Sequence, residues 1–469
     1  MADEELKQDI ARYVDSVWED VLGHMDELIQ IESVEDMDHA EPGKPYGPAA
    51  YEALDKAVQI AAELGLDAHN CDGNIGYADV KGASERYVAT IAHSDVVPVG
   101  EGWTVEPLRL TRKDGYLLGR GVLDDKGPLV LSLYAAKYFL DKGAELPYTL
   151  RAIIGNNEET NMRDVDWYLE NYPQPAFLFT PDADFPLCYG EKGGWSCWIH
   201  SAPLGDDGAI VEFTGGTVGN AIPNSAYAIV RADAASLPAA ERITVESAGE
   251  GLAKVAGHGI GGHASKPAGT INAIGLVTSY LLDNVALNDA ERTFLTFERD
   301  HVFASTDGST LGIACEDEYF DPLTCIGGTI RTKDGHLVQS LDSRYPTAIT
   351  GDEITRRVTE LAAQAGASFE LDIDMVPFVT DPTSEAIRTL VATYHECFNK
   401  DDEPFTMGGG TYARHFERAA SFGPNMPDLE LPDWVGPEHS ANEGIPEQLM
   451  KDSLKLYILA IARLMRLEL

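Results

Sequence analysis

Five short clusters of acidic residues and histidine are the part of this sequence best suited to chemistry. Together they supply two imidazoles and several carboxylates, the side chains that bind divalent metals such as zinc and manganese. Most of them directly follow a stretch that favours a β-strand, and α/β proteins build their sites at the carboxyl ends of strands. The pattern therefore predicts a dinuclear metalloenzyme. The clusters are Ala-His-Ser-Asp at 92–95, Leu-Asp-Asp-Lys-Gly at 123–127, Asn-Glu-Glu-Thr at 157–160, Thr-Pro-Asp at 180–182 and Glu-His-Ser at 438–440.

The composition and charge of the chain are typical of a folded globular protein. Its 469 residues are too many for one ordinary core, which predicts two or three domains. The formal net charge is −42. Such an acidic surface argues against nucleic acid or an anionic membrane as a partner, and a strongly solvated surface is its simplest interpretation.

The cysteines and the ends of the chain indicate a reduced, non-membrane protein. None of the six cysteines forms a Cys-x-x-Cys pair, so we expect them to be reduced and mostly structural. The N-terminus lacks the basic start and apolar run of a signal peptide. The most apolar helical stretch, 454–467, is interrupted by Lys455, Arg463 and Arg466 and does not predict a membrane span. The expected location is the cytoplasm.

Strand and helix patterns alternate over the first part of the chain, which predicts a mostly parallel sheet covered by helices. From about Gly190 to Val376 the sequence is richer in β-type stretches, glycine and small residues. Helical patterns then return before the last cluster, which implies that a second domain is inserted into the first. We predict an α/β catalytic metal-binding domain formed by 1–191 and 377–469, and an inserted α+β lid domain at 192–376.

The spacing of apolar residues locates the main elements. A long amphipathic helix is expected from Leu6 to Leu28. Further helices are expected at 49–64, 127–142, 165–171, 271–282, 353–365, 384–398 and 447–467, and strands of the first domain at 75–80, 87–92, 148–154 and 177–179.

The clusters divide into ligands for two metals. Asp124 is the natural bridge, because one carboxylate can reach two ions that lie ~3.5–4 Å apart. His93 and Asp182 would complete the first metal site, and Glu159 and His439 the second.

Two carboxylates beside these ligands need other roles. Asp95 lies two residues after His93 on an extended chain, so its side chain points the same way and can hold the imidazole ring. Glu158 precedes Glu159, and successive side chains diverge, so Glu158 can face the substrate. There it could act as a general base that takes the proton of a metal-bound water and passes it to the leaving nitrogen.

Taken singly, each cluster has a simpler interpretation. A lone His-x-Asp is more often a surface pair, and a Glu-Glu pair is usually solvated. Asp-Asp-Lys-Gly and Thr-Pro-Asp also occur in turns and at the starts of helices. The prediction of a metal site depends on the clusters occurring together, in one order, after expected strands.

That order resembles the aminoacylase-type family of dinuclear metallopeptidases, and within it the peptidase V, or Xaa-His dipeptidase, branch. The similarity runs from the cluster at 92–95 through Gly-Arg-Gly-Val-Leu-Asp-Asp-Lys-Gly-Pro at 119–128 to the cluster at 438–440, and covers nearly the whole chain. It implies a zinc-peptidase-like fold, the same ligands and general base, and a cis peptide between Asp124 and Asp125. Two divalent metals are expected, with zinc preferred and manganese as the alternative.

The resemblance also implies roles for residues of the middle domain. His263 matches the lid histidine that stabilises the oxyanion, although by itself it would be interpreted as a loop histidine without a role. Asn220 matches another lid position that contacts the substrate. Arg344 matches the arginine that holds the carboxylate of a dipeptide, although alone it would be interpreted as a surface arginine.

The segment Gly-Gly-Gly-Thr-Tyr-Ala-Arg at 408–414 also matches the family. Its glycines would let the backbone approach a substrate closely, and we expect Gly409, Gly410 and Thr411 to contact it. It does not predict a phosphate loop, since no strand with a following Gly-Lys-Ser accompanies it.

The predicted lid is long, and the resemblance connects its length to the oligomeric state. In relatives with short lids a partner subunit supplies the oxyanion histidine, whereas in the peptidase V branch an enlarged lid replaces the partner. A monomer is therefore expected, with His263 acting within one chain. Two domains that grip one substrate also imply hinge closure.

The sequence thus predicts a metal-dependent dipeptidase that hydrolyses unblocked dipeptides by means of a hydroxide bridging the metals. A deacylase of N-acyl amino acids from the same family is the first alternative, and a non-catalytic metal-binding protein is the second. The complete ligand set and the intact Glu158 favour an enzyme.

Overall fold

The computed structural model describes residues 3–469, and the chain divides into two compact units. Unit 1 consists of Met1–Gly190, Val379–Phe405 and Gly410–Leu469, and unit 2 consists of Glu191–Phe378 and Thr406–Gly409. The main divisions follow Gly190 and Phe378, and the sequence analysis placed them after residues 191 and 376. The short piece at 406–409, which groups with unit 2, was not expected.

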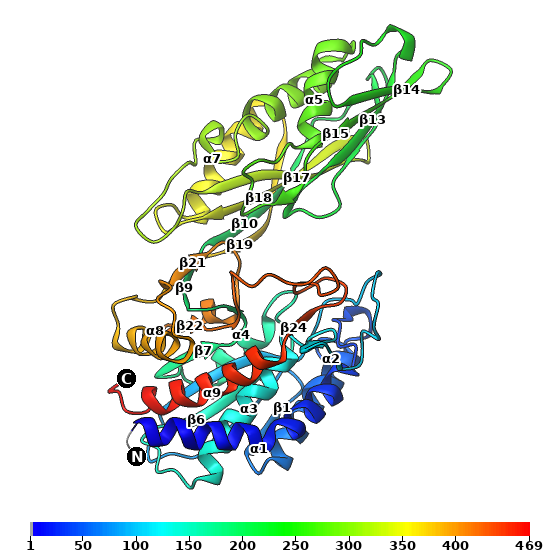
Figure 1. Cartoon of the computed structure of the whole chain (residues 1–469). Helices are drawn as coiled ribbons and strands as arrows, with labels where there is room; N and C mark the ends of the chain where they lie inside the picture. Colours follow the sequence, from blue (N-terminus) through cyan, green and yellow to red (C-terminus); the bar gives the residue numbers. More distant parts are fainter. Residues whose placement is uncertain (1–2) are drawn as a thin grey trace. The chain divides into compact units, whose positions relative to one another are not determined.

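The larger sheet belongs mainly to unit 1 and has nine strands (Figure 1). In sheet order these are β1 (Asp67–Cys71), β2 (Ile75–Val80), β6 (Thr149–Gly155), β3 (Tyr87–His93), β7 (Phe177–Thr180), β22 (Ala419–Ser421), β9 (Cys188–Glu191) and β20 (Phe378–Val379), with β21 (Phe405–Met407) paired to β9. The centre, from β6 to β22, is parallel, and β1 and β2 are antiparallel. Every residue of β3 and β7 is buried, as expected for strands covered on both faces. The predicted α/β class is confirmed.

The helices of unit 1 bury apolar stripes against this sheet and against one another. They are α1 (Asp3–Ile29), α2 (Pro48–Glu63), α3 (Lys126–Asp141), α4 (Arg163–Asn171), α8 (Glu385–Phe398) and α9 (Glu447–Leu464). The two ends of the unit meet where α1, α3 and α9 pack together (Figure 1). In α1 the buried side chains include Ile10, Val14, Val21 and Met25, which recur at helical spacing on one face.

A small three-stranded sheet joins two distant parts of unit 1. Its strands are β4 (Thr111–Lys113), β5 (Tyr116–Leu118) and β24 (Gly444–Pro446), with β24 antiparallel to β5. The pairing brings the segment after His439 beside the segment before Asp124. A second small sheet pairs β8 (Ala183–Asp184) with β23 (Pro424–Asn425).

Unit 2 is an antiparallel sheet of eight strands with its own hydrophobic core. In sheet order these are β14 (Ile243–Gly249), β15 (Leu252–His258), β13 (Ser225–Arg231), β11 (Ile210–Gly215), β17 (Thr324–Lys333), β18 (His336–Tyr345), β10 (Gly193–His200) and β19 (Ser368–Met375). Two helices, α5 (Ala273–Asn284) and α7 (Gly351–Gln364), lie on the same face of the sheet (Figure 1). A short pair, β12 (Ala221–Ile222) with β16 (Gly262–His263), stands apart.

All the elements named from the sequence are present, with ends within three residues of those expected. One helix was missed, α6 (Asp289–Phe297). Its signal was a capping box, in which Asn288 accepts the backbone N–H of Glu291 and Glu291 accepts the backbone N–H of Asn288. A single π-helical turn, Glu298–Val302, extends it.

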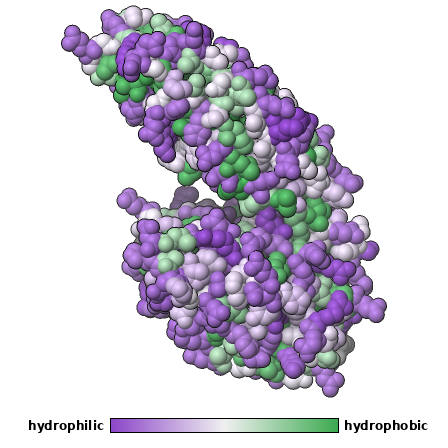
Figure 2. Space-filling model, turned by 180° about the vertical axis from the view of Figure 1, so that it is seen from behind, coloured by the Kyte–Doolittle hydropathy of each residue, from purple (hydrophilic) through white to green (hydrophobic). Residues whose placement is uncertain are grey.

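The surface agrees with the acidic composition. The face shown in Figure 2 is covered mostly by hydrophilic residues, with hydrophobic residues in smaller groups. Within residues 3–469, no helix combines the length and the hydropathy needed to cross a bilayer.

Glu298 predicts a pH dependence of stability in unit 2. It is fully buried, and its described hydrogen bond is a long one from Thr278 at 3.3 Å. Burial raises the pKa of Glu298 from 4.5 to about 8. Between these values the folded protein keeps a proton that the unfolded chain has released, so stability falls as the pH rises through this window.

We therefore expect Glu298→Gln to melt at a higher temperature than the wild type at pH 8–9, and at nearly the same temperature at pH 4.5–5. Thermal unfolding followed by circular dichroism across this range measures the difference. A gap that stays constant with pH would show that Glu298 does not titrate in this window.

Candidate metal centre

The five predicted ligands come from segments that the fold of unit 1 brings together. His93 ends β3, Glu159 follows β6 and Asp182 follows β7. These three strands are parallel neighbours, so their carboxyl ends lie at one edge of the sheet. Asp124 precedes α3, and His439 lies before β24 with a left-handed backbone, φ 61°. Sequence positions far apart thus converge on one place.

Asp124 lies between the two imidazoles. Its Oδ1 is 3.0 Å from Nε2 of His93, and its Oδ2 is 2.8 Å from Nε2 of His439. Oδ2 of Asp182 is 3.9 Å from the same nitrogen of His93, and Oε2 of Glu159 is 3.1 Å from that of His439. Two ligand atoms on one tetrahedral zinc lie roughly 3.4 Å apart. The side chains therefore form two sets that share one carboxylate, which is what a bridged pair of metals requires.

The electrostatics of these groups fit divalent cations. Nε2 of His93 is buried and, despite its closeness to Asp124, has no hydrogen-bond partner among the described residues. Burial would lower the pKa of His93, but Asp124 and Asp95 raise it well above its usual value. Burial and the neighbouring carboxylates raise the pKa of Asp182 and of Glu158. Crowded carboxylates beside an unpartnered imidazole nitrogen are a donor set that cations would stabilise.

A second grouping includes a residue to which the sequence analysis gave no role. Ligand atoms of His93, Asp125 and Asp182 lie within 4.8 Å of one another, as do those of His93, Asp124 and Glu159. Oδ2 of Asp125 accepts the backbone N–H of His93 at 3.1 Å, so Asp125 also orders the end of β3. The Asp124–Asp125 peptide is cis, as the resemblance implied. The only signal for Asp125 was the doubled aspartate.

Asp95 holds two parts of the site, in a way that differs in detail from the expectation. Nδ1 of His93 donates to the backbone carbonyl of Asp95 at 3.0 Å, whereas the carboxylate Oδ1 is 3.4 Å away. Oδ2 of Asp95 accepts the backbone N–H of Glu159 at 3.0 Å. The backbone of Asp95 therefore leaves Nε2 of His93 as the nitrogen available to a metal, and its side chain orders the backbone of Glu159, the next predicted ligand.

The loop that follows β6 and carries Glu158 is held by Asp164 and Tyr412, neither of which was singled out from the sequence. Oδ2 of Asp164 accepts the N–H groups of the two residues before Glu158, at 2.6 and 3.1 Å. The hydroxyl of Tyr412 donates to the same oxygen, and its ring lies edge-on to His93, 6.3 Å between centres. A Cβ at Gly155 would overlap this hydroxyl, so the close packing needs glycine there.

The predicted substrate contacts His263, Asn220 and Arg344 belong to unit 2, where they lie in one region. His263 in β16 pairs with Ala221 in β12, and the carbonyl of Asn220 accepts the N–H of Ala264 at 2.9 Å. Burial and the charge of Arg344 lower the pKa of His263. The pairing of two short strands thus brings together residues that the sequence keeps apart.

Arg344 is oriented by a partner that the sequence did not reveal. Its Nε and Nη2 donate to the two carboxylate oxygens of Asp342, each at 3.0 Å. Both side chains are largely buried. Asp342 thus occupies the edge of the guanidinium formed by Nε and Nη2.

The glycine-rich segment spans the division of the chain. Gly409 groups with unit 2, whereas Gly410 and Thr411 group with unit 1. Oγ1 of Thr411 accepts the N–H of Ala413 at 3.1 Å and lies 3.0 Å from the hydroxyl of Ser421. Thr411 thereby fixes the chain just before Tyr412.

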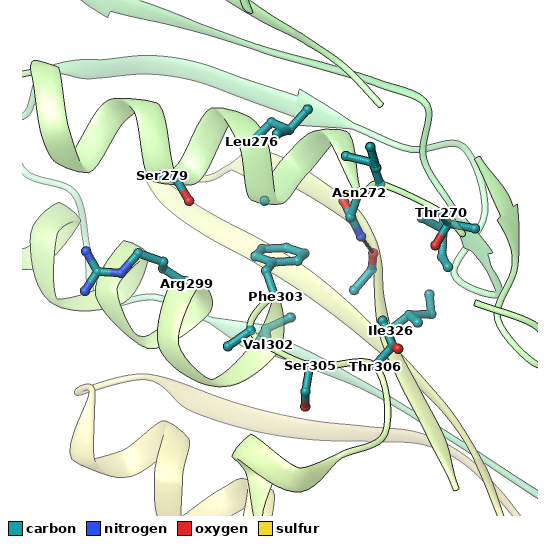
Figure 3. Close-up of a pocket in the computed structure, with 15 residues that line it drawn as sticks. Thr270, Asn272, Leu276, Ser279, Arg299, Val302, Phe303, Ser305, Thr306 and Ile326 are labelled. Atoms are coloured by element: carbon teal, nitrogen blue, oxygen red, sulfur yellow. Dashed lines mark hydrogen bonds between the residues drawn. The ribbon is translucent and has the colours of Figure 1, made fainter. Parts of the chain in front are cut away.

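A pocket of about 440 Å³ in unit 2 is lined by none of the predicted site residues (Figure 3). Leu276, Val302 and Phe303 supply apolar walls. Its main polar groups are engaged within the protein, since Arg299 pairs with Asp300 and Asn272 donates to the carbonyl of Gly327 at 2.7 Å. We do not place the chemical site there.

Comparison with known proteins gives the family. Residues 89–463 match the peptidase family M20/M25/M40. A protein of Bacillus subtilis (strain 168) named "Putative dipeptidase YtjP" is 31% identical over 467 residues, which cover 95% of this chain and 97% of that protein. The chain belongs to the peptidase family M20/M25/M40.

Solved structures share the fold at low sequence identity. Human carnosine dipeptidase 1 is similar with a TM-score of 0.59 at 15% identity, covering 98% of this chain and 99% of that one. Aminoacylhistidine dipeptidase from Vibrio alginolyticus has a TM-score of 0.57 at 13% identity, covering 95% and 96%. The family is dinuclear and metal-dependent, and this chain groups residues able to bind metal.

We expect chelator-treated protein to take up two equivalents of Zn²⁺ or Mn²⁺, and Asp124→Ala to lose both, because both sets of ligands share this carboxylate. Metal at about 100 times its dissociation constant should stabilise the wild type by about 2.7 kcal/mol. Elemental analysis after gel filtration, together with melting curves, measures both effects. Asp402→Ala, which removes a carboxylate that accepts the hydroxyl of Tyr394 elsewhere in unit 1, is the control. Two equivalents retained by Asp124→Ala would contradict the bridge.

Proposed function

We propose that the protein is a metal-dependent dipeptidase, a hydrolase that cleaves the peptide bond of unblocked dipeptides. The observation that carries the proposal is the position of Asp124, with its two oxygens facing two imidazoles in a family of metal-dependent peptidases. The names of the Bacillus relative and of the two solved structures, all dipeptidases, support this substrate class.

In this proposal His93, Asp182 and Asp124 hold one metal, and Glu159, His439 and Asp124 hold the other. Two imidazoles with three carboxylates suit zinc, and manganese is the alternative because oxygen donors prevail. When bound, such a pair polarises a carbonyl and lowers the pKa of water from ~15.7 to about 7.

Glu158 is proposed as the general base. It precedes a ligand but belongs to neither set of ligands, and Asp164 and Tyr412 order the loop that carries it. Its carboxylate can take a proton from water and give it to the amine that leaves. Asp95 supports this chemistry by keeping His93 and the backbone of Glu159 in place.

Unit 2 is proposed to bind the substrate as a lid. His263 would donate to the oxygen of the carbonyl under attack, with Asn220 beside it. Arg344, held by Asp342, would present its remaining edge to the C-terminal carboxylate of the dipeptide. Gly409, Gly410 and Thr411 would contact the substrate through the backbone, and the proposed enzyme works as a monomer.

We expect Glu158→Gln to keep both metals and lose at least about 100-fold in kcat, because a positioned general base contributes roughly 10²–10⁴-fold. Metal analysis and dipeptide hydrolysis on the same sample separate these two properties. Loss of a metal from this variant would place Glu158 among the ligands. Unchanged turnover with both metals bound would remove it from the mechanism.

Arg344 tests how the C-terminal end of the substrate is bound, whereas the substrate class is tested at the amino end. A free dipeptide and an N-acyl amino acid both carry the carboxylate that Arg344 would hold, and they differ at the amino end. We expect the wild type to prefer free dipeptides over N-acylated ones, and over dipeptide amides. Arg344→Ala should lower kcat/KM for dipeptides, by an amount that corresponds to a loss of ~2–5 kcal/mol in transition-state binding. The kcat/KM for the amides should change little, because they lack the carboxylate.

A panel of these three substrate types, with Arg356→Ala as an exposed arginine control in unit 2, measures the effect. Faster hydrolysis of the N-acylated substrates would favour the deacylase. Equal losses on dipeptides and amides would exclude Arg344 as the carboxylate partner.

A further inference from the structure

Glu443 is a buried carboxylate near the metal centre that belongs to neither set of proposed ligands. It lies four residues after His439 and is fully buried. Its Oε1 accepts the backbone N–H groups of Gly121, Leu123 and Asp124, at 3.1, 3.0 and 3.2 Å. One oxygen of Glu443 therefore accepts three backbone N–H groups of the segment that ends at Asp124, the proposed bridging residue.

The other oxygen of Glu443 is paired with Arg120. Nη1 of Arg120 donates to Oε2 at 2.5 Å, and both side chains are buried. The guanidinium lies over the ring of Trp103, with 5.4 Å to the ring centre, and its Nη2 donates to the carbonyls of Pro98 and Val99 at 3.3 and 3.5 Å. The carboxylate is thus held at both oxygens, and Arg120 offsets part of the cost of burying its charge.

The backbone of the same residue strengthens this connection. The carbonyl of Glu443 accepts the N–H of Gly119 at 3.1 Å, and the next residue begins β24, which pairs with β5. The side chain and the backbone of Glu443 therefore both connect the segment that precedes Asp124 to the segment that follows His439. Residues 121–124 have no helix or strand of their own, so their conformation must be fixed by such contacts from outside.

We infer that Glu443, together with Arg120, is a positioning residue that fixes Asp124 against His439 and thereby sets the separation of the two metals. The inference rests on the proposed function. Glu443 lies in the segment that also carries His439, whose Nε2 is 2.8 Å from Oδ2 of Asp124. A shift of residues 121–124 would move an oxygen of Asp124 away from the imidazole nitrogen that it faces.

The test is calorimetric titration of chelator-treated protein with Zn²⁺ alone, for the wild type, Glu443→Asp and Glu443→Gln. Glu443→Asp keeps the charge but withdraws the carboxylate by one methylene. Glu447→Gln is the matched control, because Glu447 lies four residues further along and also accepts a two-bond arginine pair, from Arg112 at 2.6 and 3.0 Å. Melting curves of the metal-free proteins show that each variant is folded at the titration temperature.

We expect the wild type and Glu447→Gln to bind two equivalents. In Glu443→Asp and Glu443→Gln the second equivalent should bind at least 10-fold more weakly, since groups that orient ligands contribute roughly 10–100-fold to metal affinity. If Glu443→Gln does not fold, Glu443→Asp decides. Wild-type affinity for both ions in a folded Glu443 variant would overturn the inference and leave Glu443 a purely structural role. Failure of the wild type itself to bind two ions would instead refute the proposed function.

Discussion

The candidate metal centre depends on one carboxylate placed between two imidazoles. Asp124 faces His93 with one oxygen and His439 with the other, while Asp182 and Glu159 approach from the sides. So many acidic groups in a buried place repel one another and are poorly solvated, which raises the pKa of several of them. The arrangement becomes favourable when positive charge lies among them, and two divalent cations bound by these side chains would provide that charge.

Further carboxylates hold the ligand-bearing loops in place through backbone amides. Asp95 accepts the amide of Glu159, Asp164 accepts two amides before Glu158, and Glu443 accepts three that end at Asp124. The loops at the ends of a parallel sheet leave such amides without strand partners, and buried amides must be satisfied. A carboxylate can accept several of them at once, so it satisfies the loop and fixes its shape together. This explains why the site contains carboxylates in addition to those of the proposed metal ligands.

The two units group different predicted site residues because their sheets differ. In unit 1 parallel strands end at one edge, which collects His93, Glu159 and Asp182. In unit 2 the sheet is antiparallel, and the short pairing of β12 with β16 places Asn220 beside His263. The proposed metal chemistry and the proposed substrate contacts therefore arise from separate cores.

The sequence by itself determined the class of fold, all the α-helices but one and the main strands of unit 1, because apolar periodicity is a local pattern. It also predicted the residue types of the candidate metal centre, because clusters of ligands are local patterns too. Among the elements it missed α6, although the capping box of Asn288 and Glu291 was present. Only the tertiary structure decided which carboxylates hold loops. Glu443 and Asp164 look like ordinary acidic residues in the sequence. Their roles follow from backbone amides, and for Glu443 from the guanidinium of Arg120, that only the folded chain brings within hydrogen-bonding distance. Asp342 differs, because its partner Arg344 lies two residues further along β18 on the same face of the strand.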